Sequence, residues 1–332
     1  MNRNVLTHSS ILALLTLGLG ACGGSGSGGG DEGIATGTIN LSVTDAAVDS
    51  AEQVLVQLTG VTVKPSEGEA QAIPLSGDSQ TCQDYLDGRD PSPTQAGEPT
   101  IRCIELKELQ GTNTADLLKD VVLTAGNYNW MRLDVDAKKG VMDSIIEVNT
   151  GEVYSLYVPS GSQSGLKLNT GFTILAWGSH DFVIDFDLRK SFNNPQGFED
   201  YRLKPSLRMI DLAESGNIVG AVDSSHLTAD GCTGDVNTGD GFAVYVYESG
   251  SDIGEEGSSS APLTSASVNW NADSNQWDYT VGFLAPAEYT VAFTCQAAED
   301  SAEESDNGTV LTESPESPTI VVADQDSVVN FP

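Results

Sequence analysis

The stretch GTINLSVTDAAVDSAEQVLVQLTGVTVKP, residues 37–65, decides the fold class. Its apolar residues recur at every second position in two runs, which are Ile39, Leu41 and Val43, then Val54, Val56 and Leu58. A period of two predicts strands that bury one face. After Gly60 the apolar residues continue at Val61 and Val63 on the other parity, which predicts a β-bulge or a tight turn at the glycine.

The same alternation recurs along the rest of the chain. It covers residues 131–135, 182–188, 218–222, 242–247, 277–283, 289–295, 319–322 and 327–331. One short helix is expected, over Thr114–Asp120, and residues 254–261 and 297–307 are expected to be polar loops. Many short strands separated by turns predict an all-β protein with two antiparallel β-sandwiches, Ig-like or transthyretin-like, in tandem.

The N-terminal segment has the features of an export signal. Residues 11–19, ILALLTLGL, form an apolar run of 9 residues, which is too short to span a bilayer. The run ends in LGACGGSGSGGG, residues 19–30, which resembles the lipobox of bacterial lipoproteins. That resemblance implies an acylated Cys22 as the mature N-terminus, and Gly23 implies the outer membrane. The alternative is an ordinary signal peptide cut near Ala21. The Gly/Ser-rich residues 22–35 are expected to form a flexible tether with a reach of about 20 Å.

The charge balance is strongly acidic. Lys+Arg 15 against Asp+Glu 48 gives a net charge of −33. Such a chain repels phosphates, so nucleic acid is not expected as a partner. A solvated surface adapted to salt accounts for the acidity, and many carboxylates also offer weak sites for divalent cations.

The four cysteines that follow Cys22 predict disulfides, because an even number in an exported chain is typical of cross-links. Three pairings are possible, and we favour Cys82–Cys103 with Cys232–Cys295, since each pair then lies inside one expected domain. A zinc site is the rival interpretation, but the sequence has neither a CxxC pair nor paired histidines.

Residues 36–212 resemble a bacterial family known as the domain of unknown function 4382. Four segments carry the resemblance, GTINLSVTDAAVDSAEQVLVQLTGVTVKP, LTAGNYNWMRLDV, YSLYVPSGSQSGLKLNTGFTI and DFVIDFDLRKS, in that order. The resemblance implies an exported protein, often a lipoprotein, without an assigned chemistry. The sequence TDAAV departs from the TDAP form associated with the family.

Residues 216–332 resemble the transthyretin-like, carboxypeptidase-regulatory-like sandwich. The segments GNIVGAV, YTVGFLAPAEYTVAF and VVADQDSVVNF carry this resemblance, with Ala287 where a glycine is usual. Such modules are generally accessory or binding domains. The expected organisation is therefore a signal peptide (1–21), the acylated tether (22–35), the uncharacterised β-sandwich (36–213) and the transthyretin-like β-sandwich (214–332).

The sequence offers no catalytic constellation. His8, His180 and His226 are isolated, and no HExxH motif occurs. SGSQSG at 160–165 does not fit G-x-S-x-G and is expected to be a hairpin turn. Asp185, Asp187 and Arg189 alternate on one strand, which predicts a solvated sheet face or a salt-bridge ladder rather than acid–base chemistry or a calcium site.

Two loops contain oxygen ligands in a calcium-like pattern. The candidates are Asp235, Asn237, Asp240, Asn271, Asp273 and Asn275. Neither set has the full spacing of a tight site, so only weak, salt-like calcium binding is expected and no other cofactor. Trp270 and Trp277 could stack on sugars, but they alternate with polar residues as core aromatics do.

Together these features predict a non-catalytic lipoprotein of the cell outer membrane, facing the periplasm or the cell surface. Its expected partners are the bilayer, through Cys22, and an envelope protein or glycan. A structural or accessory subunit of an envelope assembly is the second hypothesis, and an envelope hydrolase is the third.

Overall fold

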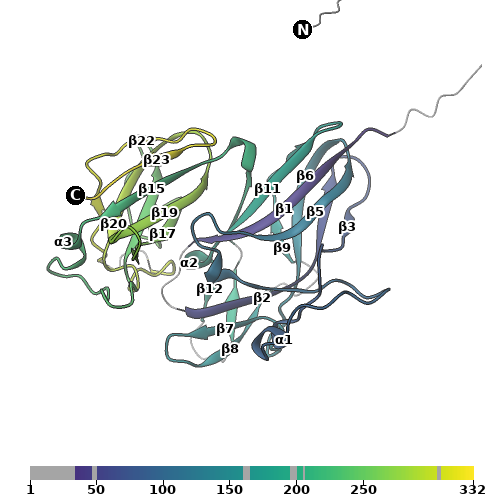
Figure 1. Ribbon diagram of the computed structural model, residues 1–332, viewed down its shortest axis with the longest axis horizontal. Coiled ribbons are helices and arrows are strands. Elements are labelled where there is room, and N and C mark those ends of the chain that lie inside the picture. The colour runs from purple at the N-terminus through teal and green to yellow at the C-terminus, as the bar shows by residue number, and fades with distance from the viewer. Residues whose placement is uncertain (1–33, 47–50, 160–164, 195–199, 205, 305–307) are drawn as a thin grey trace, which may run out of the picture. The chain divides into compact units, whose positions relative to one another are not determined.

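Strand β1 (Thr36–Ala46) opens the folded part of the chain and is central to its first sheet. The computed structural model describes residues 34–332 except 47–50, 160–164, 195–199, 205 and 305–307 (Figure 1). The sheet has the order β14-β11-β1-β5. Its other strands are β5 (Ala115–Thr124), β11 (Ser179–Asp187) and β14 (Leu207–Asp211). The alternation seen in the sequence has its predicted effect, because Ile39, Leu41 and Val43 are fully buried.

Strand β2 (Ala51–Pro65) is the longest and organises the second sheet. The main path is β10-β6-β2-β7-β8-β13-β12, and β3, β4 and β9 attach at its sides. These strands are β3 (Gln71–Ile73), β4 (Arg102–Glu105), β6 (Gly126–Asp136), β7 (Ile145–Val148), β8 (Val153–Tyr157), β9 (Leu166–Leu168), β10 (Phe172–Ile174), β12 (Phe192–Asn193) and β13 (Tyr201–Leu203). The pairing of β2 with β6 shifts register between Leu58 and Gly60, so the predicted β-bulge is confirmed.

One predicted element is wrong. Residues Thr114–Asp120 do not form a helix, because Ala115–Thr124 is strand β5, which pairs with β1. Leu117 and Leu118 are both buried there. Pairing with an existing buried strand outweighs a local preference that seven residues express only weakly.

The second half of the chain builds two further sheets. One has the order β18-β19-β15-β23, and the other has β17-β16-β20-β21 with β22 at its side. The strands are β15 (Gly216–Val222), β16 (Ala243–Glu248), β17 (Thr264–Ser267), β18 (Asn269–Asn271), β19 (Gln276–Leu284), β20 (Glu288–Thr294), β21 (Thr312–Glu313), β22 (Thr319–Ile320) and β23 (Asp326–Val328). Most lie where the alternation predicts them.

Each half has its own core between two sheets, so the protein is all-β with two sandwiches. One core draws on β1, β5 and β11 from the first sheet and on β2 and β6 from the second, and the other core draws on β15 and β19 facing β16 and β20. Three pairings are parallel, namely β1 with β11, β8 with β13 and β15 with β23. The sheets that contain these pairings are mixed rather than purely antiparallel. The sequence did not predict this, because a period of two does not distinguish parallel from antiparallel neighbours.

Short helical segments connect the strands. They are α1 (Cys82–Leu86), η1 (Leu106–Leu109), α2 (Leu188–Ser191), η2 (Leu212–Glu214) and α3 (Ser224–Leu227). None of the helices in the described ranges has the length and apolarity that crossing a bilayer requires. Among the described residues, no strand before η2 pairs with a strand after it. Residues Ala35–Pro332 nevertheless pack as one compact unit. The domain boundary at 213/214 stays a prediction.

Each sandwich contains a tyrosine whose hydroxyl bonds to a backbone carbonyl four residues earlier. Tyr128 donates its hydroxyl to the Thr124 carbonyl at 2.9 Å, and Tyr289 donates to the Ala285 carbonyl at 2.9 Å. Each bond reaches back four residues across the turn that begins a strand, as in the tyrosine corner of β-sandwiches. The two bonds account for a similarity in the sequence, since LTAGNYNWMRLDV (123–135) and LAPAEYTVAFTC (284–295) both place an apolar residue and a small turn before a tyrosine that leads into a strand.

Candidate ligand-binding site

A cavity of about 440 Å³ lies where residues of both sandwiches meet. Its walls come from the end of β1, from β11, from the loop after η1 and from β17, β18 and β19. The lining residues that matter for binding are Thr44, Asp45, Gln110, Asn113, Asp185, Ser267, Asn269, Trp270, Asn271 and Asp278. The walls approach closely at two glycines, since a Cβ on Gly282 would lie 2.2 Å from the Gly111 carbonyl oxygen. A side chain at Gly282 would therefore push the walls apart.

Trp270 is the most exposed of the three aromatic residues that line this cavity, the others being Tyr279 and Phe283. It lies on β18, whose three residues are all exposed, and its side chain is 50% exposed. The prediction that Trp270 is a core aromatic is therefore wrong. Strand β18 is a short edge strand that pairs only with β19 among the described strands, so one side of the indole stays open. Trp277 is partly buried and supports Trp270 edge-on, with 5.7 Å between ring centroids.

Amide side chains line the same cavity as the indole. Within the described residues, the side chains of Gln110, Asn113 and Asn269 make no protein hydrogen bond, so their donors and acceptors are available. Asp278 is held in place, because its Oδ2 accepts from Asn271 Nδ2 at 3.0 Å and from Ser274 Oγ at 2.7 Å. An open aromatic face beside free amides is suited to a neutral ligand that presents both hydroxyls and C–H groups.

Two buried carboxyl groups close the inner end of the cavity. Asp185 is 4% exposed and accepts from Arg208 Nε at 3.0 Å and Nη2 at 2.5 Å. Asp45 is 3% exposed, and neither of its oxygens has a hydrogen-bond partner among the described residues. Burial, and then the charges of Asp185 and Asp187, raise the pKa of Asp45 well above its ordinary value. Burial in this site therefore favours the protonated form of the Asp45 carboxyl group.

The strand face predicted at Asp185, Asp187 and Arg189 is not solvated. All three residues are buried, and Arg189 lies in α2, beyond the end of β11. The alternative prediction, a salt-bridge ladder, describes the site better than a solvated face does. Asp185 forms an ion pair with Arg208, and Asp187 forms one with Lys190 at 2.7 Å. The last residues of β11 are buried on both faces, so alternation there does not separate core from solvent.

The residues of α2 contact the second sandwich through buried charges. Lys190 Nζ donates to the Pro262 carbonyl at 2.7 Å and lies 3.4 Å from Glu256 Oε2. Arg189 Nη1 donates to the Ala297 carbonyl at 2.7 Å, and its guanidinium lies 5.7 Å from the Tyr245 ring centroid. Burial, and then the charge of Asp187, raise the pKa of Glu256 to about 7. The buried position of Glu256 could not be predicted, because Glu256 lies in a segment expected to be a polar loop.

The calcium candidates mainly bond within their own loops. Asp235 Oδ1 accepts from the Asn237 backbone at 2.8 Å and from its side chain at 2.7 Å, and these bonds lower the pKa of Asp235. Asn271 Oδ1 accepts from the Asp273 N–H at 2.9 Å. In the part of the chain that the structure describes, no cluster of three or more His, Cys, Asp or Glu residues is arranged to hold a metal ion. Weak binding through Asp240, Asn275 and their neighbours stays a prediction.

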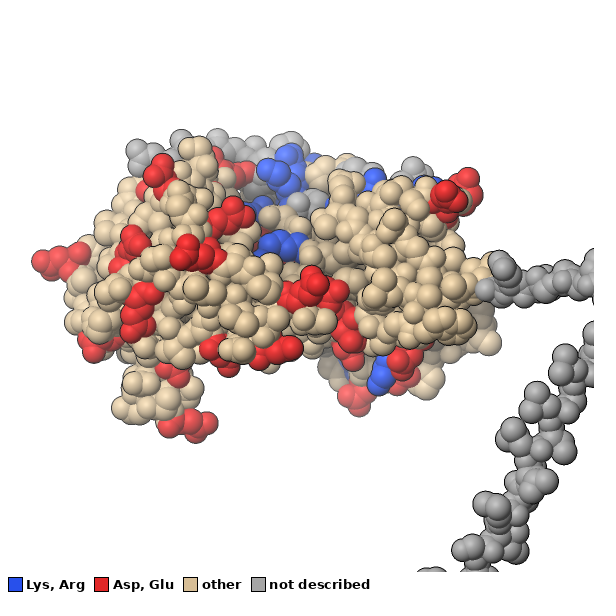
Figure 2. Space-filling view, turned by 90° about the horizontal axis from the view of Figure 1, so that it is seen from above, with Lys and Arg blue, Asp and Glu red and all other residues tan. Residues whose placement is uncertain are grey.

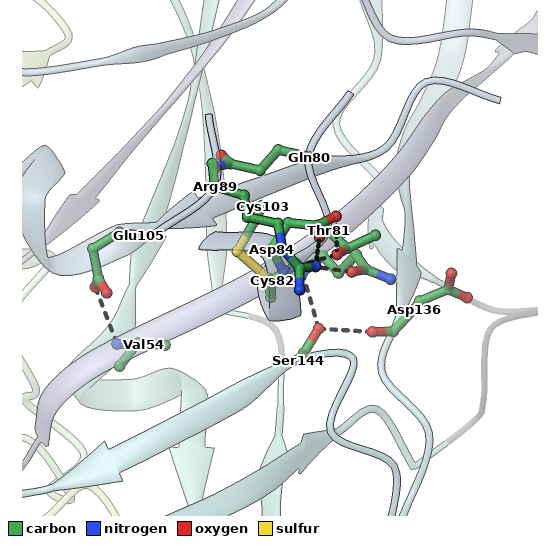
Figure 3. Close-up of a disulfide and its surroundings, with 11 residues drawn as sticks. Val54, Gln80, Thr81, Cys82, Asp84, Arg89, Cys103, Glu105, Asp136 and Ser144 are labelled. Atoms are coloured by element: carbon green, nitrogen blue, oxygen red, sulfur yellow. Dashed lines mark hydrogen bonds and ion pairs between the residues drawn. A yellow bond between two sulfur atoms is a disulfide. The ribbon is translucent and has the colours of Figure 1, made fainter. Parts of the chain in front are cut away.

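Two disulfides join Cys82 to Cys103 and Cys232 to Cys295, which is the pairing favoured from the sequence. Figure 3 shows the first bond beside α1, whose N-terminus is capped by Thr81 Oγ1 accepting from the Asp84 N–H at 3.0 Å. The disulfide covers the outer face of β2, where Leu55 and Ile145 pack against Cys82. Strand β2 is therefore buried on both faces.

The remaining predicted sites divide into two groups. Some of them lie outside the described residues, namely Cys22, the predicted signal peptide, most of the predicted tether and residues 160–164 of SGSQSG. The two mature histidines have structural contacts, since His180 Nε2 accepts from the Leu175 N–H at 2.9 Å and His226 Nε2 lies 2.9 Å from the Pro332 carbonyl oxygen.

Residues 36–205 match the family described as a domain of unknown function, DUF4382. No curated protein matches the chain. Among solved structures, the chain is similar to a candidate cell adhesion protein from Bacteroides fragilis, with 9% identity, TM-score 0.21, and coverage of 88% of this chain and 91% of that chain. The minor pilin of Streptococcus agalactiae shares 11% identity at TM-score 0.16, with 88% and 94% covered. A fimbrial protein from Bacteroides ovatus shares 9% identity at TM-score 0.20, with 89% and 48% covered. All three TM-scores are too low to establish a common fold.

Proposed function

This chain belongs to the DUF4382 family, and on that premise we propose that it is a non-catalytic binding module of the cell envelope whose cavity takes a carbohydrate. The observation that carries the proposal is the open face of Trp270 beside three amide side chains without protein partners. An indole stacks on the C–H face of a sugar ring, and amides bond its hydroxyls as both donor and acceptor.

The negative charge of the protein disfavours carbohydrates that are themselves anionic. In Figure 2 acidic side chains are spread over the visible face, and basic ones are few. With a net charge of −33, the protein repels anionic polysaccharides at long range. A neutral glycan, or one with amino groups, is therefore the favoured ligand class.

The buried carboxyl groups favour binding over hydrolysis. Glycoside hydrolysis needs two carboxyl groups that reach the scissile bond. Both oxygens of Asp45 are sealed from solvent, and Asp185 is occupied by Arg208. Neither group is placed to protonate or attack a ligand in the cavity.

Binding to a glycan array tests this function. The wild-type protein should bind neutral or amino glycans, and Trp270→Ala should weaken that binding about tenfold or more, because one stacked aromatic contributes on the order of 1–3 kcal/mol. Trp177→Ala is the matched control, since Trp177 is also exposed but does not line the cavity. Binding that survives Trp270→Ala, or turnover of a bound glycan, would overturn the proposal.

A further inference from the structure

The turn between β10 and β11 presents two large apolar side chains to solvent. Leu175 is 61% exposed and Trp177 is 86% exposed, the highest value among the large apolar residues described. Trp177 also has φ +64°, in the left-handed region that a bulky residue rarely adopts. An exposed indole on a strained backbone gains nothing from the folded chain itself, which indicates a contact outside it.

Hydrogen bonds fix this turn against the start of β1. The Trp177 N–H donates to the Thr36 carbonyl at 2.8 Å, and the Thr38 N–H donates to the Gly178 carbonyl at 2.9 Å. The approach is so close that a Cβ on Gly37 would lie 2.4 Å from the Leu175 carbonyl oxygen. The turn that carries the indole is therefore held against Thr36, where strand β1 begins.

This end of the sandwich carries no charge on the three segments that meet there. Residues 33–44, 121–131 and 168–180 contain no Asp, Glu, Lys or Arg, in a protein with 63 such residues counted as 15 basic plus 48 acidic. Acidic residues flank these segments, because Asp31 and Glu32 precede the first one in the sequence. Farther along β1, Asn40 accepts from the Asp120 N–H and donates to Asp181, both at 2.7 Å. Figure 2 shows a mainly uncharged surface at the right-hand end of the first sandwich, with one group of acidic side chains at its upper corner.

We propose that this apolar tip, formed by Val122, Leu175 and Trp177, lies in the surface of the bilayer that anchors Cys22. Cys22 precedes Thr36 by 14 positions, and a Gly/Ser-rich stretch of that length reaches only about 20 Å. The tip is thus the part of the fold nearest the anchor along the chain. Indole rings favour the membrane–water interface, which accounts for an exposed Trp177 at this position. The inference rests on the lipidation of Cys22 and is independent of carbohydrate binding.

Lipid quenching of tryptophan fluorescence tests the inference on the full lipidated protein. The protein is reconstituted into phosphatidylethanolamine vesicles containing a minority of phosphatidylglycerol, with or without bromine on the acyl chains near the headgroup. We expect brominated lipid to quench the wild type, Trp177→Phe to lose most of that quenching, and Leu175→Ser to reduce it. Trp270→Phe is the control and should keep the full effect, because Trp270 lies in the second sandwich.

Two results would overturn the inference. The first is equal quenching in wild type and Trp177→Phe. The second is a mature Cys22 without lipid, seen in the mass of the N-terminal peptide, because the tip would then have no anchored bilayer to meet. Glycan binding that depends on Trp270 would survive either result, so the two proposals fail separately.

Discussion

The conformation of Trp177 has a cost that can be measured apart from any membrane. Its Cβ crowds the following carbonyl at φ +64°, and glycine at the same position has no Cβ. Trp177→Gly should therefore unfold with a free energy about 1 kcal/mol higher than Trp177→Ala, which keeps the strain while losing the ring. Urea unfolding of the two variants in solution makes the comparison. Equal stabilities would show that the turn accommodates a side chain without strain.

Single residues are also where the sequence was least informative. Asp185 and Asp187 have the alternation of a solvated face, yet both are buried, because the end of β11 lies between α2, Arg208 and the second sandwich. Trp270 has the alternation of a core residue, yet it lies on an edge strand and is open. Alternation shows that two faces differ, but only the neighbouring sheets decide which face meets water.

Among the elements, the two disulfides close loops of different length, with sequence separations of 21 and 63 residues. Closing a longer loop removes more entropy from the unfolded chain. Replacing Cys82 and Cys103 by alanine should cost about 3 kcal/mol, and replacing Cys232 and Cys295 about 4 kcal/mol. Denaturant unfolding of the two double variants measures the difference. The opposite order would mean that the packing of α1 around the shorter loop matters more than loop entropy.

Most strands could be predicted because their apolar residues alternate and glycine-rich or acidic turns separate them. The bulge at Gly60 could be predicted because the phase changes at one glycine. The strand at Thr114–Asp120 could not be predicted, since its two adjacent leucines fit a helix and a strand buried on both faces equally well. The pairing of β1 with β11 could not be predicted either, because the paired residues are 141 positions apart and no local signal encodes the pairing.

At the scale of the whole molecule, buried carboxyl groups set the response to pH. Burial raises the pKa of Glu105 and of Glu256 to about 7, against an ordinary value of 4.5. Between these values the folded state holds protons that the unfolded state has released, so stability falls as pH rises through this window. Below it both states are protonated, and above it both are ionised. Asp45 acts in the same direction.

Thermal unfolding across pH 4.5 to about 7 tests this response. Glu256→Gln removes one titrating group and should lose less stability than the wild type over the window, while the two proteins converge at its acid end. Exposed Glu67→Gln is the control and should follow the wild type. A wild-type stability that rises with pH would contradict the protonated state of these buried acids.

The candidate cavity itself could not be predicted at this scale. Its walls come from β1, from the loop after η1 and from β17 to β19. The lining residues farthest apart in the sequence are Thr44 and Phe283, 239 positions from one another. Each segment alone is an ordinary strand end or a polar turn. Only the contact between the two sandwiches, which the buried charges of α2 help to hold, brings Trp270 and the amides together.

The central position of β1 has a mechanical consequence. A cell-envelope protein held at its N-terminus receives external load through its first strand. Strand β1 has β11 on one side and β5 on the other, with 9 residue pairs in register with β11 alone. A pull directed along β1 therefore loads both ladders in shear, so that many backbone hydrogen bonds must break together, whereas an edge strand peeled from its end would lose them one by one. The proposed tether of residues 22–35 would therefore load the first sandwich through a strand that is paired on both sides.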